Sequence, residues 1–308
     1  MHVPVLAQAC IDWLQVQAGG TYVDCTAGGG GHAELIAERL ADGRLIALDR
    51  DPGAAEGVRK RLAKYRFATV YQRNYSQLEA VLNELEIKAV DGILLDAGMS
   101  SMQLDDPGRG FSFQEVGPLD MRMDTTQGLT AAEWLASTTT SEIAHTLKEF
   151  ADVGPAMRIA QSIHERAGEG RLATTHDLRA ATQDVLGNAF DKGSVVRQVF
   201  QAIRIAVNQE LDALKTVLPA AIRHLNPGGR LVVLSFHSGE DRVVKNAFQT
   251  FSRKQRTFNP DGTDAVVQPP YIRVLTKKPQ LPTAAEMAAN PRAQSAKLRV
   301  AERLETAA

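Results

Sequence analysis

The sequence predicts an α/β fold, in which a mostly parallel sheet is covered by helices on both faces and is interrupted by a helical insertion. Three observations lead to this prediction. Short apolar strands alternate with amphipathic helices through the first hundred residues, the alternation stops after Asp96, and it resumes at "GGRLVVLSF", residues 228–236. Regular strand–helix alternation is typical of parallel sheets, because each crossover between parallel strands requires a helix.

Four strands and three helices are expected before Asp96. The strands are "TYVDCT" (21–26), "GRLIALD" (43–49), "FATVYQ" (67–72) and "VDGILLD" (90–96). The helices cover 32–40, 53–65 and 75–87, and the first places Ala33, Ile36, Ala37 and Leu40 on one face. Ligands of such folds bind at the carboxyl ends of the strands, so residues just after each strand are the candidates for function.

The insertion is predicted at 109–199, between two parts of one sheet domain, 1–108 and 200–308. A turn-rich segment (98–124) precedes helical stretches from about Thr130 to Leu186. One long helix is then expected over about Val195–Leu225, with apolar residues three or four apart at 196, 200, 203, 207, 211, 214 and 218. The segment "YIRVLTKK", 271–278, is predicted as the last strand.

Composition narrows the class of protein. A chain of 308 residues, 44% hydrophobic and 23% charged, is long enough to bury a full core. Two cysteines, scattered histidines, no membrane-length apolar run and no signal peptide favour a cytoplasmic protein without a disulfide framework or metal site. Because the net charge is −1, a nucleic-acid partner would have to be bound by local basic patches.

The stretch "DCTAGGGGHAE", residues 24–34, joins the first strand to the first helix of the alternation. Gly28, Gly30 and Ala33 fit the G-x-G-x-x-G/A dinucleotide pattern, and Asp49 ends the next strand, where a carboxylate would bind ribose hydroxyls. A nicotinamide oxidoreductase is therefore one alternative, and a turn needed only for packing is another. A P-loop is excluded because no Lys-Ser/Thr follows the glycines.

Three features favour S-adenosylmethionine over a nicotinamide. Asp24 lies at the end of the first strand, where methyltransferases commonly place an acid near the methionine part of the cofactor. His32 opens the helix, where a backbone N–H can meet a carboxylate, although a solvent-facing histidine is the alternative. Asp96 ends the fourth strand, beside the expected position of the adenine and the reacting methyl group.

The segment 92–124, "GILLDAGMSSMQLDDPGRGFSFQEVGPLDMRMD", resembles the signature of the bacterial 16S ribosomal RNA (cytosine-N4)-methyltransferases, the MraW family. Six further segments agree in order: "HVPVL" (2–6), "GGGGHAELI" (28–36), "LDRDP" (48–52), "FQAIRIAVNQEL" (200–211), "GGRLVVLSFHSGEDRVVK" (228–245) and "NPRAQSAKLRVAER" (290–303). The chain departs from the family pattern at 194–198, Gly239, Gln161 and Gln294, where RNA contacts rather than cofactor contacts are expected.

The resemblance implies a class I, Rossmann-like methyltransferase sheet with an inserted helical substrate domain. It implies S-adenosylmethionine as cofactor, and methylation of N4 of a cytidine in the decoding region of 16S ribosomal RNA. The cofactor contacts that it implies are Gly30, Gly31, His32, Asp49, Tyr75, Asp96 and Gln103. The partner would be the small ribosomal subunit or its RNA, with no membrane involved; a homodimer is an open alternative for the oligomeric state.

The turn after Asp96 reads Ala97-Gly98-Met99, without the prolines of DNA amino-methyltransferases, so the acceptor that binds the cytosine amino group must be supplied in another way. The candidates are Asp96, then Asp120 with Asp124, or the carbonyl and hydroxyl groups of "SFHS" (235–238). Asp120 would share a helical face with Asp124 while Arg122 points away; pairing with an arginine is the alternative for Asp120.

RNA contacts are predicted at Arg109, Arg204 and Asn208. Arg109 precedes Phe111 and Phe113, which offer rings for base stacking or, alternatively, for the core. Arg204 and Asn208 belong to a polar stripe with Arg197 and Gln201 on the long helix. A non-catalytic RNA-binding or assembly factor is the third functional alternative, because the altered positions fall where RNA would be bound.

Overall fold

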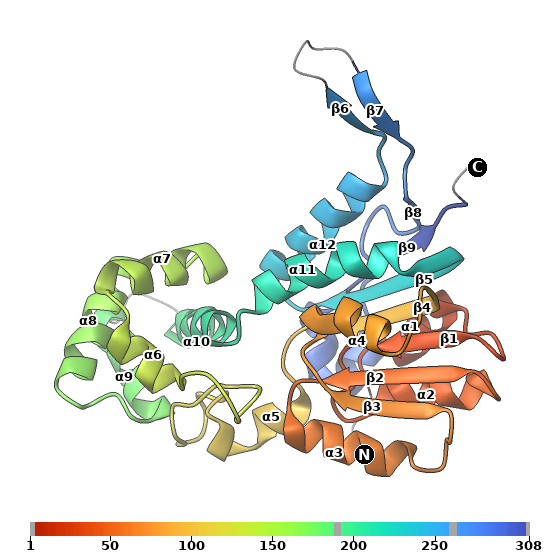
Figure 1. Ribbon diagram of the computed structural model, residues 1–308. Coiled ribbons are helices and arrows are strands. Elements are labelled where there is room, and N and C mark those ends of the chain that lie inside the picture. The colour runs from red at the N-terminus through yellow and green to blue at the C-terminus, as the bar shows by residue number, and fades with distance from the viewer. Residues whose placement is uncertain (1–3, 188–191, 259–263, 306–308) are drawn as a thin grey trace. The chain divides into compact units, whose positions relative to one another are not determined.

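The computed structural model describes residues 4–187, 192–258 and 264–305 (Figure 1). The chain divides into two compact units, one formed by Met1–Gly98 with Leu211–Ala308 and the other by Met99–Glu210. The second unit is thus wider at both ends than the insertion expected at 109–199.

The first unit contains a seven-stranded sheet with the order β3-β2-β1-β4-β5-β9-β8. Strands β1 to β5 are parallel, and β9 runs antiparallel to both β5 and β8. The strands are β1 (Thr21–Asp24), β2 (Arg44–Asp49), β3 (Ala68–Gln72), β4 (Val90–Asp96), β5 (Leu225–Ser235), β8 (Ile272–Val274) and β9 (Lys297–Arg303).

Strand order reverses between β1 and β4, because β2 and β3 extend the sheet on one side of β1 and β4 and β5 extend it on the other. In open α/β sheets such a reversal leaves a crevice at the carboxyl ends of the two central strands, and ligands bind there. Asp24 ends β1 and Asp96 ends β4, so both acids lie at this reversal point.

Helices cover both faces of the sheet, and alternate residues of each strand face opposite layers. In β2, Leu45 and Ala47 pack with one group of helices, while Ile46 and Leu48 pack with the other. The first group is α1 (Ala7–Leu14), α2 (Gly31–Leu40) and α3 (Pro52–Leu62); the second is α4 (Leu78–Glu84), α11 (Glu210–Arg223) and α12 (Ser238–Phe251). The βαβ order predicted for the first hundred residues is confirmed.

The expected last strand is largely wrong. Only Ile272–Val274 of the segment 271–278 forms a strand, and β9, which was not predicted, lies between β5 and β8. The four residues Leu298–Ala301 of β9 are all buried, because this strand is covered on both faces and pairs on both edges. The short strands β6 (Gln255–Phe258) and β7 (Asp264–Gln268) form a separate hairpin, and α13 (Ala284–Ala289) and η3 (Pro291–Ser295) precede β9.

The second unit is helical. It contains α5 (Ser101–Asp105), η2 (Pro107–Arg109), α6 (Ala131–Ser137), α7 (Thr140–Ala151), α8 (Ala156–Gly168), α9 (Thr175–Leu186) and α10 (Lys192–Asn208). Helices α6, α7 and α9 begin at threonines with an acid three residues later, and in each helix both hydrogen bonds of a capping box are present. Such boxes satisfy backbone N–H groups that the first helical turn leaves without partners. The unit has its own apolar core, which includes Phe111, Ile159 and Ile203.

The single long helix expected over Val195–Leu225 is two helices. Gln209 adopts a left-handed conformation, with φ of 50°, between α10 and α11. Asn208 stabilises the end of α10, because its side chain donates to Arg204 O at 2.9 Å. The helical apolar spacing continues through this break, so the sequence pattern alone did not reveal it.

Candidate active site

Three aspartates end adjacent parallel strands of the first unit: Asp49 on β2, Asp24 on β1 and Asp96 on β4. Since the strands run in the same direction, these carboxyl groups lie along one edge of the sheet. The glycine loop between β1 and α2 lies at the same edge. The sequence predicted this arrangement, and the side-chain contacts show what each acid does there.

Asp49 fixes the glycine loop to the end of β2. Its Oδ2 accepts the Gly28 N–H at 2.7 Å, and its Oδ1 accepts the Asp51 N–H at 2.8 Å. Burial raises the pKa of this carboxyl to about 6, although the two backbone hydrogen bonds favour the charged form. Each carboxylate oxygen has more than one lone pair, so Asp49 can still accept from ribose hydroxyls as predicted.

Two glycines of the loop have structural requirements of their own. Gly30, at φ 79°, precedes α2 in the left-handed region, which glycine tolerates at little cost. At Gly31 a Cβ atom would lie 2.3 Å from Pro4 Cγ, so any side chain would collide with the amino-terminal segment. At Gly29 a Cβ atom would meet nothing within 4 Å. The loop therefore packs closely against protein at Gly31 and not at Gly29.

Asp24 is completely buried, and burial raises its pKa to about 7. Its Oδ1 accepts the Thr26 N–H at 3.0 Å, but its Oδ2 has no hydrogen-bond partner in the part of the chain that the structure describes. A buried acceptor without a donor is costly, so a ligand that donates hydrogen bonds and carries positive charge would be favoured beside it.

Asp96 and His32 form a pair at the end of β4. Asp96 Oδ2 lies 3.6 Å from His32 Nδ1, and Asp96 Oδ1 is a second buried oxygen without a hydrogen-bond partner among the described residues. His32 Nε2 lies 3.2 Å from the carbonyl oxygen of Val5, which can only accept, so Nε2 is the nitrogen that carries the proton. His32 is 5% exposed, so the alternative of a solvent-facing histidine is wrong.

The environment of Asp96 favours its protonated form. Burial raises the pKa of this carboxyl to about 8, and the charges of Asp24 and Glu240 raise it further in the same direction. A group that gains and loses a proton near neutral pH is suited to acid–base chemistry. Asp96 is held in place from its backbone, since its N–H donates to Thr26 Oγ1 at 2.6 Å.

The first turn of α12 adds Glu240, which was not a sequence candidate; in this region the sequence had offered only the carbonyl and hydroxyl groups of residues 235–238. Glu240 is 2% exposed, and its Oε2 accepts the N–H groups of Phe236 at 2.7 Å and His237 at 3.3 Å. Its Oε1 lies 3.2 Å from His237 Nε2. The available signal was topological: β5 pairs with β4, so the residues after β5 adjoin those after Asp96.

Tyr75 and Gln103 complete the predicted cofactor set. Tyr75 begins the short helix η1 (Tyr75–Gln77) after β3, and it is half-buried against the core on the α4 side of the sheet. Gln103 belongs to the second unit, where it is buried and accepts the Ser100 N–H at 2.9 Å in the capping box of α5. Their contacts with a cofactor stay predictions.

The geometry expected for Asp120 is wrong. Residues 120–124 do not form a helical turn, and Met121 has φ of 59°. Both oxygens of Asp120 accept from the Arg122 guanidinium at 2.8 Å. Burial alone would raise the pKa of Asp120, but the hydrogen bonds from Arg122 lower it below its usual value. The alternative of an arginine partner is the one observed. Because the guanidinium neutralises the charge of Asp120 and lowers its pKa, this carboxylate is a weak base for an amino proton.

The predicted RNA contacts have structural roles in the second unit. Asn208 is 2% exposed; its side chain donates to Met121 O at 2.7 Å and accepts the Met123 N–H at 2.8 Å, so it joins the end of α10 to the segment 121–123. Arg204 forms a two-point ion pair with the buried Glu210. Arg109 donates to the carbonyl groups of Arg122 and Met123.

The two phenylalanines beside Arg109 follow the core alternative. Phe111 is 5% exposed, and the Phe113 ring packs edge-on against Phe200 with centroids 5.7 Å apart. Both rings therefore contribute to the apolar core of the second unit.

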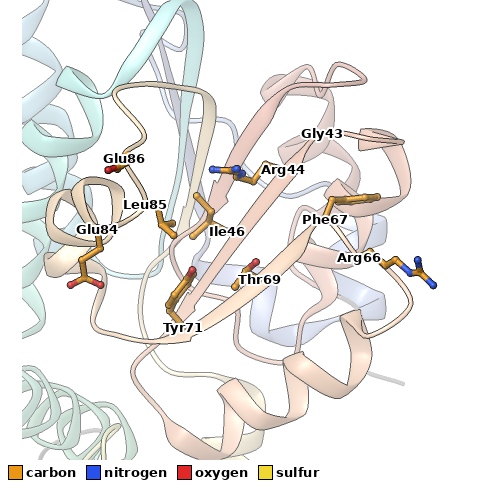
Figure 2. A pocket seen from close by; sticks show the side chains of 10 residues that line it. All are labelled: Gly43, Arg44, Ile46, Arg66, Phe67, Thr69, Tyr71, Glu84, Leu85 and Glu86. Atoms are coloured by element: carbon orange, nitrogen blue, oxygen red, sulfur yellow. The ribbon is translucent and has the colours of Figure 1, made fainter.

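A groove of about 610 Å³ lies away from the aspartates, beside β2 and β3 (Figure 2). Figure 2 shows Ile46, Thr69 and Tyr71 on the sheet and Leu85 beyond the end of α4. The end of α4 borders the groove, since Glu84, Leu85 and Glu86 are among its lining residues. None of the three strand-end aspartates lines it, so it is separate from the candidate active site.

The residues of the first unit fit S-adenosylmethionine. The two orphaned oxygens, Asp24 Oδ2 and Asp96 Oδ1, would favour its positively charged ammonium and sulfonium groups, and Asp49 can accept from its ribose. No group of three or more His, Cys, Asp or Glu side chains in the described ranges could hold a metal ion. No helix in those ranges combines the length and the apolar character needed to cross a membrane.

The sheet order with its antiparallel β9, the glycine loop after β1 and the acids after β1, β2 and β4 define a class I methyltransferase. Comparison with known proteins supplies the family. The chain belongs to the MraW methylase family, whose sequence model matches residues 1–304. S-adenosylmethionine is accordingly its methyl donor, and the nicotinamide alternative is wrong.

The relatives are similar over their whole length. The chain is 43% identical to "Ribosomal RNA small subunit methyltransferase H" of Nitrosomonas europaea, over 99% of this chain and 98% of that protein. It is 44% identical to the protein of the same name from Azoarcus sp. (strain BH72), over 100% and 98%. Among solved structures, an rRNA methylase from Streptococcus thermophilus gives a TM-score of 0.45 at 9% identity, with 99% of each chain covered.

Proposed function

We propose that this chain transfers a methyl group from S-adenosylmethionine to N4 of a cytidine in the decoding region of 16S ribosomal RNA. The small-subunit substrate is supported by the full-length relatives named as ribosomal RNA small subunit methyltransferases. The observation that carries the choice of chemistry is Asp96, a carboxyl at the end of β4 whose pKa lies at about 8 and whose Oδ1 has no partner among the described residues.

The chemical problem is the weak nucleophilicity of the cytosine amino group, whose lone pair is delocalised into the ring. An acceptor that binds an amino hydrogen localises the lone pair on N4 as N4 attacks. When bound, the cofactor supplies a methyl group on a positively charged sulfur. The N4–C bond forms as the C–S bond breaks, and the electron pair of the C–S bond stays on sulfur.

Asp96 is the proposed acceptor and base. Its carboxylate form accepts a hydrogen bond from the amino group and then takes the proton that N4 loses, which passes on to water. The Thr26 hydroxyl, which accepts the Asp96 N–H, holds the end of β4 in position. Proximity of donor and acceptor supplies much of the remaining rate, because correct placement of the reactants removes most of the entropy cost.

The other predicted residues bind rather than react. Asp49 is proposed to accept from the ribose hydroxyls, Asp24 to face the ammonium group, and Gly30, Gly31 and His32 to lie along the methionine part. Tyr75 and Gln103 are proposed to complete the cofactor site. Asp120 is not proposed as a catalytic residue, because Arg122 holds both of its oxygens.

The test uses the full-length protein with radiolabelled S-adenosylmethionine and small ribosomal subunits that lack the modification. We expect label in the 16S ribosomal RNA, and loss of label with Asp96→Ala while S-adenosylhomocysteine still binds. A protein that binds the RNA and the cofactor but transfers no methyl group would instead be the non-catalytic assembly factor.

A further inference from the structure

The turn after β5 lies directly beside the turn after Asp96. Asp96 pairs with Leu234 in the parallel β4–β5 ladder, and Ala97 N donates to Leu234 O at 3.1 Å, so the pairing continues past the end of β4. Two residues further on, a Cβ atom on Gly98 would lie 3.9 Å from Phe236 Cδ2. The Phe236 ring therefore lies against the backbone that leads away from the proposed catalytic carboxyl.

Phe236 is held from its own backbone. Glu240 Oε2 accepts its N–H at 2.7 Å, and the same carboxylate contacts His237 through Oε1 at 3.2 Å. Glu240 is 2% exposed, and a buried carboxylate must be compensated by hydrogen bonds and charge. Here that carboxylate fixes the turn that carries the ring, so Phe236 has a defined orientation relative to Asp96.

The reaction requires an apolar surface at this place. A base that presents N4 to Asp96 has been taken out of its stack, and proteins replace the lost stacking with aromatic side chains. The turn after Asp96, Ala97-Gly98-Met99, offers no ring. Phe236 is only partly buried, and Gly98 has no side chain that would cover the ring edge facing it.

We propose that Phe236 is the stacking surface for the target cytosine, and that Glu240 is the positioning residue that orients it. This inference rests on the proposed function. The aromatic ring that the segment after β4 lacks is thus supplied by the adjacent strand, and recognition of the base is divided between the ends of β4 and β5.

The first experiment separates stacking from packing with three variants of the full-length protein. Phe236→Leu keeps an apolar side chain but loses the ring, whereas Phe236→Tyr keeps the ring. We expect Phe236→Leu to lower kcat/KM for unmodified small subunits roughly 5- to 100-fold, with unchanged S-adenosylhomocysteine affinity, and Phe236→Tyr to stay near wild type. The matched control is Phe248→Leu, at a phenylalanine that is 2% exposed on α12, the helix that follows the turn with Phe236, and it should lower Tm without this loss.

The second experiment tests Glu240 through a pH profile. Asp96 is faced by Asp24 from β1, His32 from α2, Glu240 from α12 and, more weakly, Cys10 from α1. The negative charge of Glu240 raises the pKa of Asp96, so Glu240→Gln should move the rising limb of kcat/KM to lower pH. If Glu240 also orients Phe236, the variant should in addition lower kcat/KM on the high-pH plateau, where the charge effect on Asp96 no longer contributes. A profile that shifts with an unchanged plateau would overturn the positioning role.

The outcomes distinguish the two proposals. If the wild-type protein transfers no methyl group to small subunits, the proposed function fails. If the wild type is active and Phe236→Leu matches it, the function stands and the stacking role is wrong. Loss of S-adenosylhomocysteine binding in Phe236→Leu would place the ring in the cofactor site and would also overturn this inference.

Discussion

Asp96 Oδ2 lies 3.6 Å from Nδ1 of His32, and the other nitrogen of the same ring bonds to the carbonyl oxygen of Val5. Because Nε2 must donate to that carbonyl, neutral His32 presents a lone pair to Asp96. The protonated form of Asp96 can then donate toward Nδ1, whereas the carboxylate form cannot. The amino-terminal segment, through the carbonyl oxygen of Val5, thus fixes the His32 ring beside the proposed catalytic acid.

The pH dependence of the reaction follows from Asp96. The proposed mechanism needs its carboxylate, and the pKa lies at about 8, so kcat/KM should rise with pH up to about 8 and then level off. Asp96→Asn should lower kcat by roughly 100-fold or more, since general bases contribute factors of that size. Steady-state kinetics between pH 6 and 9 provides the measurement; a rate that falls over this range would contradict the role of base.

The buried Asp24 should cost stability in the protein without cofactor. Its pKa is raised to about 7, above the value of about 4 in an unfolded chain, so the folded state prefers the protonated form. Stability is therefore greatest below about pH 4 with respect to this group, and is lost as pH rises through 7.

Asp24→Asn removes that cost and should raise the free energy of unfolding at pH 8 by on the order of 1–4 kcal/mol, with a smaller gain at pH 5. The same variant should bind S-adenosylhomocysteine more weakly. Asp12→Asn, at an exposed aspartate on α1, serves as the control and should change neither quantity. Urea titrations at both pH values measure the free energy of unfolding. A lower free energy of unfolding for Asp24→Asn at pH 8 would contradict the prediction.

Gly29 and Gly31 of the glycine loop should respond differently to substitution by alanine. Gly31→Ala places a Cβ atom 2.3 Å from Pro4 Cγ and should weaken S-adenosylhomocysteine binding about 10-fold or more, since overpacking costs 1–3 kcal/mol. Gly29→Ala meets nothing within 4 Å and should be tolerated.

A second substitution tests the cause of the Gly31 effect. Pro4→Ala removes Cγ and Cδ, the two nearest atoms, and leaves Cβ at 3.5 Å, so the double variant Pro4→Ala/Gly31→Ala should recover affinity. Isothermal titration calorimetry gives the affinities. Equal losses in the Gly29 and Gly31 variants would show that the contact with Pro4 is not the reason.

Asn208 should prove structural rather than RNA-binding. Asn208→Ala leaves Met121 O and Met123 N without their side-chain partner and should lower the free energy of unfolding by about 1–3 kcal/mol. Arg197→Ala, at an exposed position of the same polar stripe, should leave stability unchanged. The measurements are denaturation curves and RNA-binding affinities of both variants. Normal stability with weakened RNA binding in Asn208→Ala would contradict the structural role and would support a direct contact between Asn208 and RNA.

The parallel strands of the sheet could be predicted from the sequence alone, because apolar runs such as Val90–Leu95 are too short for helices and recur at regular intervals. The sequence was also sufficient for Asp24, Asp49 and Asp96, which lie where parallel strands end. The sequence did not predict β9 or the helix break at Gln209, because both depend on contacts that the local pattern does not show. Strand β9 pairs with β5 and β8. The break at Gln209 is stabilised by the side chains of Asn208 and Glu210.

Side-chain partners were the least predictable part of the site. Nothing in the spacing of Asp120 and Arg122 shows that they pair in a non-helical turn, and the four-residue interval to Asp124 favoured the wrong geometry. The Phe236 ring and the Glu240 carboxylate were overlooked for a related reason, although the carbonyl and hydroxyl groups of residues 235–238 were candidates. They lie far from Asp96 in sequence, and only the β4–β5 register brings them beside it.

The most direct test is to identify the methylated atom. Unmodified small subunits are incubated with the full-length protein and S-adenosylmethionine, the 16S ribosomal RNA is digested to nucleosides, and mass spectrometry locates the new methyl group. We expect N4-methylcytidine from one site in the decoding region, lost with Asp96→Asn although S-adenosylhomocysteine still binds. A methyl group on another atom or base, or undiminished N4-methylcytidine with Asp96→Asn, would contradict it.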